Sequence, residues 1–155
     1  MELKNLCDYP QYSETIARWI YDEFIDGIKA RITYDMVLSS FKKRKKDSLP
    51  LTIVALENKE CLGTVSLVEN DLKLRDYTPW LAALYVAEEH RKRGIGQVLV
   101  KKSISLANEL GYNELFLRTE YAADYYKKLN WAFVEELVDE FGIHTKVFKK
   151  KLSNE

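Results

Sequence analysis

Apolar side chains recur along the chain with two different periods, and each period predicts a different kind of element. A spacing of three to four residues predicts an amphipathic helix; in the first such segment Ile16, Ile20 and Phe24 share one face. The third segment ends before Gly111, which suits a left-handed C-terminal cap. In all, helices are predicted over residues 13–25, 33–41, 95–110 and 121–129.

Runs rich in β-branched and aromatic residues predict the strands. Residues 51–56 and 62–68 flank a short polar turn and predict an antiparallel hairpin. The eight apolar residues from Trp80 to Ala87 do not alternate with polar ones, so we expect a strand buried on both faces near the sheet centre. The strand–helix–strand order that follows implies one parallel pair. Further strands are predicted over residues 114–119, 131–138 and 143–149.

Together these elements predict an α/β fold of the α+β type, with a mixed, mostly antiparallel central sheet flanked by helices. The chain of 155 residues suits one domain, and we expect a single domain over residues 1–155. The 24 Lys and Arg residues balance the 24 Asp and Glu residues, so no broadly basic surface for nucleic acid or membrane is expected. No apolar run approaches a membrane span of roughly 20 residues and no secretory signal is visible, so we expect a cytoplasmic protein.

The two cysteines indicate neither a metal site nor a redox motif. Cys7 and Cys61 form no CxxC pair and have no nearby histidine. We therefore expect no metal site and two reduced, buried thiols, with a catalytic thiol as the less favoured alternative.

The segment between the strand at 80–87 and the long helix carries the strongest functional signal. Residues 91–96 hold three basic side chains and two glycines. Glycines allow a tight turn, so that backbone N–H groups at a helix start can converge on an anion, and the basic side chains add charge-assisted bonds. The anion that fits is a diphosphate; the alternative is a solvated basic turn. The spacing excludes a Rossmann fingerprint, because Leu99 occupies its third small-residue position, and there is no P-loop.

The chain resembles the GNAT superfamily of acyl-CoA N-acyltransferases in this loop and in two further segments. The resemblance rests on the strand Leu84-Tyr85-Val86, the R-x-x-G-x-G loop 91–96 and the segment Tyr125-Tyr126-Lys127-Lys128-Leu129-Asn130-Trp131. It implies that the loop binds the pyrophosphate of coenzyme A, and that a bulge in the preceding strand exposes amides to the pantetheine arm. The cofactor-binding residues that it implies are Leu84, Tyr85, Val86, Arg91, Lys92, Arg93, Gly94, Ile95, Gly96 and Gln97.

The resemblance also implies a catalytic residue. Tyr126 occupies the family position of the general acid that protonates the leaving thiolate; the alternative is a tyrosine that only packs. Asn130 replaces the usual glycine, which is tolerable because Asn also enters the left-handed region. Thr119 stands where an Asn often binds the cofactor, so its contact with coenzyme A is open.

The general base and the acceptor site are less defined. The strand 80–87 holds no carboxylate, and a water relay is one alternative to a carboxylate elsewhere. The candidate bases are Glu23, Asp26, Asp35, Glu69, Asp71 and Glu120. The candidate acceptor-site residues are the aromatics Trp19, Tyr21, Phe24 and Tyr34, with Asp22, Glu23 and Asp26 to attract a cation; the alternative is that these aromatics belong to the core. His90 is a possible further phosphate contact, and the basic run 42–46 is expected to be a solvated helix end.

The sequence therefore predicts an N-acetyltransferase that moves an acetyl group from acetyl-CoA to a primary amine by direct attack in a ternary complex. The acceptor is a small molecule or a peptide, and the chain is a monomer or a homodimer. Two alternatives stay open: an inactive coenzyme A-binding sensor or partner-binding module, and a protein N-terminal acetyltransferase.

Overall fold

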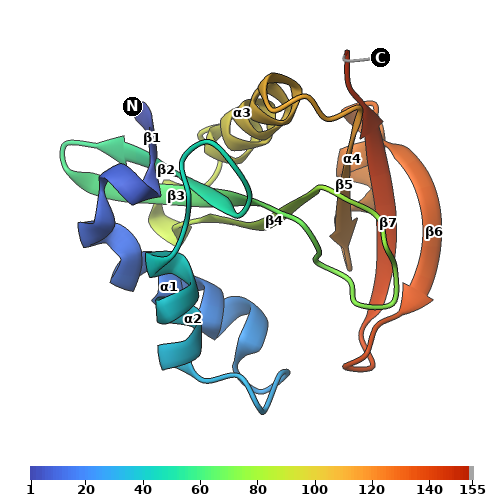
Figure 1. The fold of residues 1–155 in the computed structure, drawn as a ribbon, viewed down its shortest axis with the longest axis horizontal. Helices are drawn as coiled ribbons and strands as arrows, with labels where there is room; N and C mark the ends of the chain where they lie inside the picture. Colours follow the sequence, from blue (N-terminus) through green and yellow to red (C-terminus); the bar gives the residue numbers. More distant parts are fainter. Residues whose placement is uncertain (154–155) are drawn as a thin grey trace.

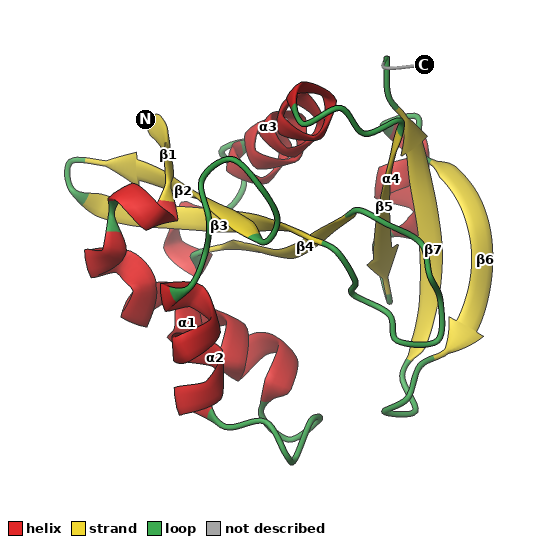
Figure 2. Ribbon diagram, in the orientation of Figure 1, coloured by secondary structure: helices red, strands yellow, loops and turns green. Residues whose placement is uncertain are grey.

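A seven-stranded mixed sheet forms the centre of the molecule in the computed structural model, which describes residues 1–153 (Figures 1 and 2). The strands are β1 (Glu2–Asn5), β2 (Leu51–Glu57), β3 (Glu60–Val68), β4 (Trp80–Val86), β5 (Glu114–Thr119), β6 (Ala132–Val138) and β7 (His144–Lys151). The α-helices are α1 (Ser13–Ile20), α2 (Tyr34–Lys42), α3 (Ile95–Glu109) and α4 (Ala123–Lys128). Shorter turns are the 3₁₀ segments η1 (Leu6–Asp8), η2 (Pro10–Tyr12) and η4 (Glu88–His90), and the π-helical η3 (Tyr21–Ile25).

The strand order is β1-β2-β3-β4-β5-β7-β6, and only β4 and β5 pair in parallel within residues 1–153. This confirms the predicted mixed, mostly antiparallel sheet. The β2–β3 hairpin turns through Asn58 and Lys59, both with positive φ. Strand β1 was not predicted; its segment has one apolar residue, Leu3, which is too little for a strand pattern.

Two cores cover the two faces of the sheet. Helix α3 packs over one face on Leu51, Ile53 and Leu67, and the larger core continues to Phe148. Helices α1 and α2 pack over the other face. Figure 1 shows α3 on one side of the β1–β4 half, α1 and α2 on the other, and α4 behind β5 and β7. The predicted C-terminal cap of α3 is present, since Gly111 has a φ of 90°.

The first predicted helix differs from the structure in its second half. The α-helical part ends at Ile20 and continues as the π-helical turn η3, in which the N–H of Asp26 donates to the carbonyl oxygen of Tyr21 at 2.8 Å. The backbone hydrogen bond of a π turn spans five residues, where that of an α turn spans four. The residue buried after Ile20 is therefore Ile25, and Phe24, which the helical spacing placed on the buried face, is exposed.

Strand β4 is also less buried than predicted. Residues 80–82 and Ala87 are buried, whereas residues 83–86 are only half-buried. The reason is that β4 and β5 pair only at Trp80 and Phe116 within the described chain, so the second half of β4 has no strand beside it on that edge.

Smaller expectations also need correction. Cys7 is exposed, because the buried position of its turn is taken by Leu6; Cys61 is buried as expected. Arg44, in the basic run, is half-buried and donates from Nε to Thr52 Oγ1 at 2.9 Å, while its four lysine neighbours are exposed. Helices among residues 1–153 lack the length and apolar character needed to cross a bilayer.

Candidate active site

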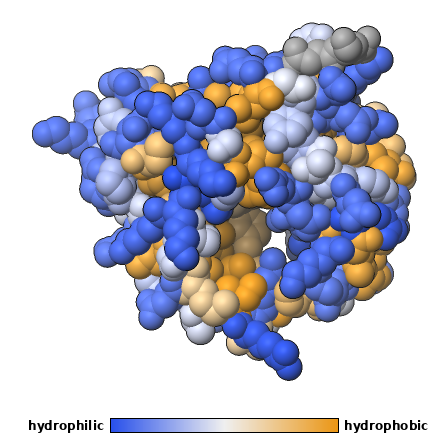
Figure 3. Space-filling model, in the orientation of Figure 1, coloured by the Kyte–Doolittle hydropathy of each residue, from blue (hydrophilic) through white to orange (hydrophobic). Residues whose placement is uncertain are grey.

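The sheet opens between β4 and β5, and the candidate site lies at this opening. Trp80 and Phe116 join the two halves of the sheet there and pack with Leu72 and Val147 in a small core of their own. Figure 3 shows a hollow near the middle of the molecule, between the helical side and the β6–β7 hairpin, with hydrophobic atoms along its sides. The predicted cofactor strand, residues 84–86, borders this divide on the edge where β4 has no partner strand.

A bulge in β4 sets where the opening begins. Ser66 of β3 pairs with Ala82 and Thr64 pairs with Tyr85, so one β3 residue stands opposite two β4 residues. Ala83 in the bulge has a φ of 52°, a left-handed conformation that is rare for alanine and that the surrounding structure must stabilise. A bulge leaves backbone groups unpaired and bends the strand. The predicted pantetheine contacts are residues 84–86, which are the second bulge residue and the two residues that follow it.

Gly63 permits the close approach of β3 to this bent strand. A Cβ at position 63 would lie 2.8 Å from the carbonyl oxygen of Tyr85 and 3.3 Å from Leu99 Cδ1. No side chain fits at these distances without moving the β4 backbone. Gly63 could not be singled out from the sequence, since a single glycine in a strand does not show which residue lies beside it.

The predicted anion loop has the backbone shape that the glycines implied. Lys92 and Gly94 have φ values of 66° and 79°, and Gly94 is the N-cap of α3. No side chain caps this helix start, and the N–H of Val98 donates to the carbonyl oxygen of Gly94 at 3.1 Å. The N–H groups that precede Val98 have no intrahelical acceptor. They form a ready anion site at the positive end of the helix dipole.

The predicted residues of this loop divide by exposure. Arg91, Lys92, Arg93, Gly94 and Gln97 are exposed, and Gly96 is half-buried. Ile95 is buried in the core under α3, so only its backbone N–H is available to a ligand.

Both arginines of the loop contact the protein itself. Arg91 donates from Nε to the carbonyl oxygen of Val86 at 2.9 Å, and its guanidinium lies 5.3 Å from the centre of the Tyr85 ring. Arg93 reaches Glu57 Oε2 at 3.2 Å and His90 Nδ1 at 3.2 Å. The loop is thereby tied to β4 and to the β2–β3 hairpin before any ligand binds.

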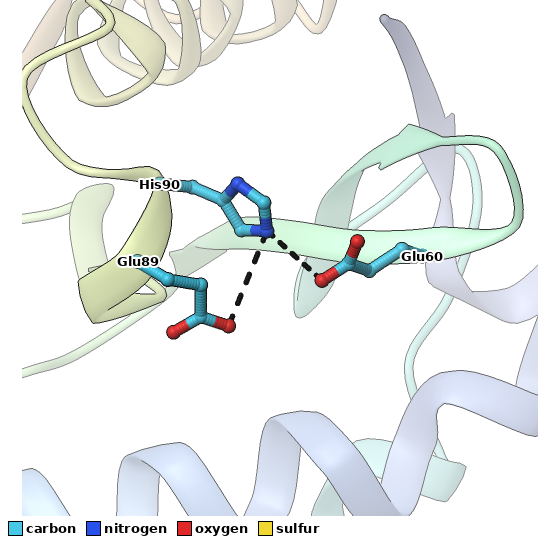
Figure 4. Close-up of side chains that lie close together, drawn as sticks. All are labelled: Glu60, Glu89 and His90. Carbon is cyan, nitrogen blue, oxygen red and sulfur yellow. Dashed lines mark hydrogen bonds and ion pairs between the residues drawn. The ribbon is translucent and has the colours of Figure 1, made fainter.

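His90 lies between two carboxylates, as Figure 4 shows: its Nε2 is 2.9 Å from Glu60 Oε2 and 4.0 Å from Glu89 Oε1. These distances would allow a metal ion, but Arg93 argues against one. A metal on Nε2 requires the proton of a neutral imidazole on Nδ1, where it would face the N–H of Arg93. The arrangement fits a hydrogen-bonded chain in which Arg93 donates to Nδ1 and Nε2 donates to Glu60.

Tyr126 projects from α4 into the larger core and is 7% exposed. Its ring packs against Tyr125, Trp131 and Phe148. Burial raises the pKa of its hydroxyl to about 12. No described residue forms a hydrogen bond with that hydroxyl, which leaves it available to a ligand. The left-handed turn after α4 is present, with a φ of 67° at Asn130.

Thr119, at the end of β5, has a local structural role. Its Oγ1 accepts a hydrogen bond from the N–H of Ala122 at 3.0 Å, which orders the start of α4. Helix α4 begins at Ala123, two residues later than predicted.

The predicted acceptor aromatics separate into two groups. Trp19 packs against Tyr85 of β4, with ring centres 5.2 Å apart and ring planes tilted by 33°, so it borders the bulged strand. Tyr21 and Tyr34 instead surround Arg18, whose guanidinium lies 3.9 Å from the Tyr34 ring. The exposed Phe24 contributes to neither group.

The candidate bases also separate once their exposure is known. Five of the six are exposed, and only Asp71 is half-buried. Asp71 Oδ2 lies 3.6 Å from Arg118 Nε, and Arg118 Nη1 donates to Asp139 Oδ2 at 3.0 Å. Arg118 and Asp139 were not predicted from the sequence, because they come from different strand ends and no local pattern links them.

Known proteins resemble the chain in family and in fold. The model of the acetyltransferase (GNAT) family matches residues 13–131 of the chain. A search of curated protein sequences finds no match.

Solved structures with the same fold include several acetyltransferases. An aminoglycoside 6'-N-acetyltransferase complexed with coenzyme A superimposes with a TM-score of 0.75 at 14% identity, covering 97% of each chain. A putative acetyltransferase from Salmonella typhimurium with its cofactor acetyl-CoA gives 0.73 at 18% identity, over 100% of this chain and 95% of that one. An N-acetyltransferase from Staphylococcus aureus Mu50 gives 0.74 at 20% identity, over 99% and 100%. At these identities the likeness establishes the fold.

Proposed function

The chain belongs to the GNAT family of acetyltransferases, and from this premise we propose that it transfers an acetyl group from acetyl-CoA to a primary amine by direct attack in a ternary complex. The observation that carries the proposal is the uncapped start of α3 beside a bulged β4 whose second half has no strand on one edge. This pairing offers an anion site and a row of free amides side by side.

The cofactor fits this surface in one direction. The pyrophosphate would bind the backbone N–H groups at residues 94–97, with Arg91, Lys92 and Arg93 adding charge. The pantetheine arm, which carries two amides, would pair with residues 84–86 as a short extra strand. Two of the solved relatives were crystallised with coenzyme A or acetyl-CoA, which supports this choice of ligand.

The chemistry requires a proton for the leaving thiolate. In the proposed reaction the ammonium first gives a proton to water, and the neutral amine nitrogen bonds to the thioester carbonyl carbon. As the carbon–sulfur bond breaks, the sulfur takes a proton from the Tyr126 hydroxyl, and the proton that the nitrogen then loses passes through water to the Tyr126 oxygen. With its pKa raised to about 12, this hydroxyl stays protonated at neutral pH. Burial also raises the pKa of the Cys61 thiol to about 12, which argues against a cysteine acyl-enzyme.

The acceptor class is a small amine or a peptide amine. The relatives include enzymes named for aminoglycosides, which supports amino sugars as members of a first acceptor panel. The predicted cytoplasmic location and the state as monomer or homodimer stay predictions.

Coenzyme A binding is the first test. A ligand that binds only the native state raises the melting temperature, by about 5 °C or more at a hundredfold excess over Kd for a chain of this size. Release of free thiol from acetyl-CoA should then be measured with amino sugars, small alkyl amines and peptides with free N-termini. No thermal shift with saturating coenzyme A would contradict the proposal, and a shift without thiol release would favour a coenzyme A-binding module.

A further inference from the structure

The proposed transfer needs a group that holds the acceptor amine, and one carboxylate is placed for this. At neutral pH an alkyl amine is almost fully protonated, with a pKa near ~10.4, so a carboxylate is its natural partner. Strand β4 offers none. Asp71, in the loop between β3 and β4, is the one half-buried member of the six candidate carboxylates.

Asp71 belongs to a charged cluster in which its two partners are already satisfied. Asp139 accepts the N–H groups of Phe141 and Ile143 on Oδ1, at 2.8 and 2.9 Å, and Arg118 on Oδ2 at 3.0 Å. Its side chain is 1% exposed. Asp71, by contrast, has one ion pair, to Arg118 at 3.6 Å, and its side chain is 34% exposed. Asp139 therefore fixes Arg118, and Asp71 keeps carboxylate oxygen capacity for a ligand.

The cluster lies at the opening of the sheet. Arg118 follows Phe116 by two residues, so the two side chains share a face of β5 and Arg118 lies where β4 and β5 begin to diverge. Leu72, next to Asp71, packs beside Trp80 and Phe116 at this junction. Asp71 is thus anchored by its neighbour at the edge of the divide.

Segments from both halves of the molecule meet around this cluster. Lys29, in the loop after η3, lies 5.1 Å from the centre of the Phe141 ring at the β6–β7 turn. Figure 1 shows that turn, the end of β5 and the β3–β4 loop on one side of the opening, facing the loop after η3. Asp71 therefore lies where the two halves of the molecule approach each other, within electrostatic reach of Lys29 and Arg118.

We propose that Asp71 binds the ammonium group of the acceptor amine, an inference that rests on the proposed acetyl transfer. Burial raises the pKa of Asp71, although Arg118 and Lys29 oppose this effect, so the carboxylate gains from a further cationic partner. The acceptors that this site selects are cationic amines.

The test compares Asp71→Asn with wild type for the best amine of the acceptor panel. Loss of a charge-assisted hydrogen bond should raise the KM for the amine about 10- to 100-fold. The Kd for coenzyme A, measured by calorimetry, and the melting temperature should stay close to wild type, because Asp139 still holds Arg118. Asp71→Glu should restore part of the affinity, since it returns the carboxylate.

The matched control is Asp76→Asn, which removes one negative charge from the same loop at an exposed position. It should leave the KM for the amine unchanged. Equal KM values for wild type and Asp71→Asn would overturn the role of Asp71 while acetyl transfer stands. A wild-type protein that acetylates no amine would overturn the proposed function itself, and the role of Asp71 with it.

Discussion

Tyr126 combines two properties that are rarely found together, a buried aromatic ring and a hydroxyl with no partner among the described residues. Burial raises its pKa to about 12, whereas a thiol has a pKa near ~8.5. Full proton transfer to the thiolate is therefore uphill by about 5 kcal/mol in the unliganded site. Tyr126 can therefore give its proton to the sulfur only as the carbon–sulfur bond breaks, together with the return of the proton that the amine nitrogen loses.

We predict that Tyr126→Phe lowers kcat by about 10²-fold, the lower end of the range for general acids, because the phenol is a weak donor here. The Kd for coenzyme A should change little, since the ring still fills the core. Steady-state kinetics and calorimetry measure the two quantities. Tyr125→Phe, on the 43% exposed neighbour, is the matched control and should keep full activity. Equal kcat values for both variants would remove Tyr126 from the chemistry.

Residues of the site differ in how far sequence reveals them. The anion loop is contiguous, so its glycines and basic residues could be recognised as one pattern. Asp71, Arg118 and Asp139 lie far apart along the chain and meet only through the fold. Sequence reasoning placed Asp71 among six equal candidates, and only its burial separates it from the others.

At the scale of elements, the fold and the proposed cofactor binding both require a glycine at the start of α3. Gly94 has a φ of 79°, and a Cβ there would meet no atom within 4 Å. Gly111, at the other end of the same helix, has a φ of 90° and equally open surroundings. The two glycines therefore carry the same backbone requirement, but only Gly94 faces the proposed pyrophosphate.

We predict that Gly94→Ala and Gly111→Ala each lower the free energy of unfolding by about 1–2 kcal/mol, because alanine is strained in the left-handed region. Only Gly94→Ala should also weaken coenzyme A binding, on the order of tenfold, because its Cβ enters the space where the phosphate meets the amides. Denaturant unfolding and calorimetry separate the two effects. An equal loss of affinity in both variants would mean that the phosphate lies elsewhere.

The elements themselves were mostly predictable, and the departures share a cause. Periodicity locates a helix or a strand, but it does not show where the backbone changes its hydrogen-bond register. The π turn after Ile20 and the bulge at Ala83 are such changes, and each re-aims the side chains that follow it. Both border the proposed acceptor and cofactor surfaces, where local irregularity is expected.

At the scale of the whole molecule, the two halves of the sheet depend on few connections. Beyond the Trp80–Phe116 junction, the β3–β4 loop reaches across to the outer strand β6. Arg75 forms a two-pronged ion pair with Glu135, at 2.7 and 2.8 Å, and the Tyr77 hydroxyl donates to the same carboxylate. This contact fixes the loop that carries Asp71 against the far half of the molecule.

At this scale the net charge of zero can be related to where the charged side chains lie in the fold. It excluded a broadly basic surface, but opposite charges are distributed unevenly over the fold. Exposed arginines lie at the start of α3. The carboxylate of Asp71 lies in the β3–β4 loop, and that of Glu135 lies on β6, where it contacts the same loop. A neutral chain can thus present an anion site and a cation site on the two sides of one opening.

The contact between the halves makes stability depend on pH in a defined direction. Hydrogen bonds from Arg75 and then Tyr77 lower the pKa of Glu135 from 4.5 to about 2. A lowered folded pKa stabilises the native state above the unfolded value, so this contribution is complete above pH 4.5 and is lost as the pH falls towards 2. Solvent screening at this partly exposed site reduces the contribution to about 1 kcal/mol.

We predict that Glu135→Gln lowers the free energy of unfolding at pH 7 by about 1 kcal/mol and that the difference from wild type disappears near pH 2. Urea unfolding at a series of pH values measures the difference. Glu136→Gln, on the exposed neighbour in the same strand, should show no such pH-dependent difference. If Glu135→Gln instead differs from wild type by the same amount at every pH, the Arg75 ion pair is not the source of the stabilisation. The β3–β4 loop would then depend on the packing of Leu72 and Tyr77 and on the Asp71–Arg118 ion pair for its position beside the opening.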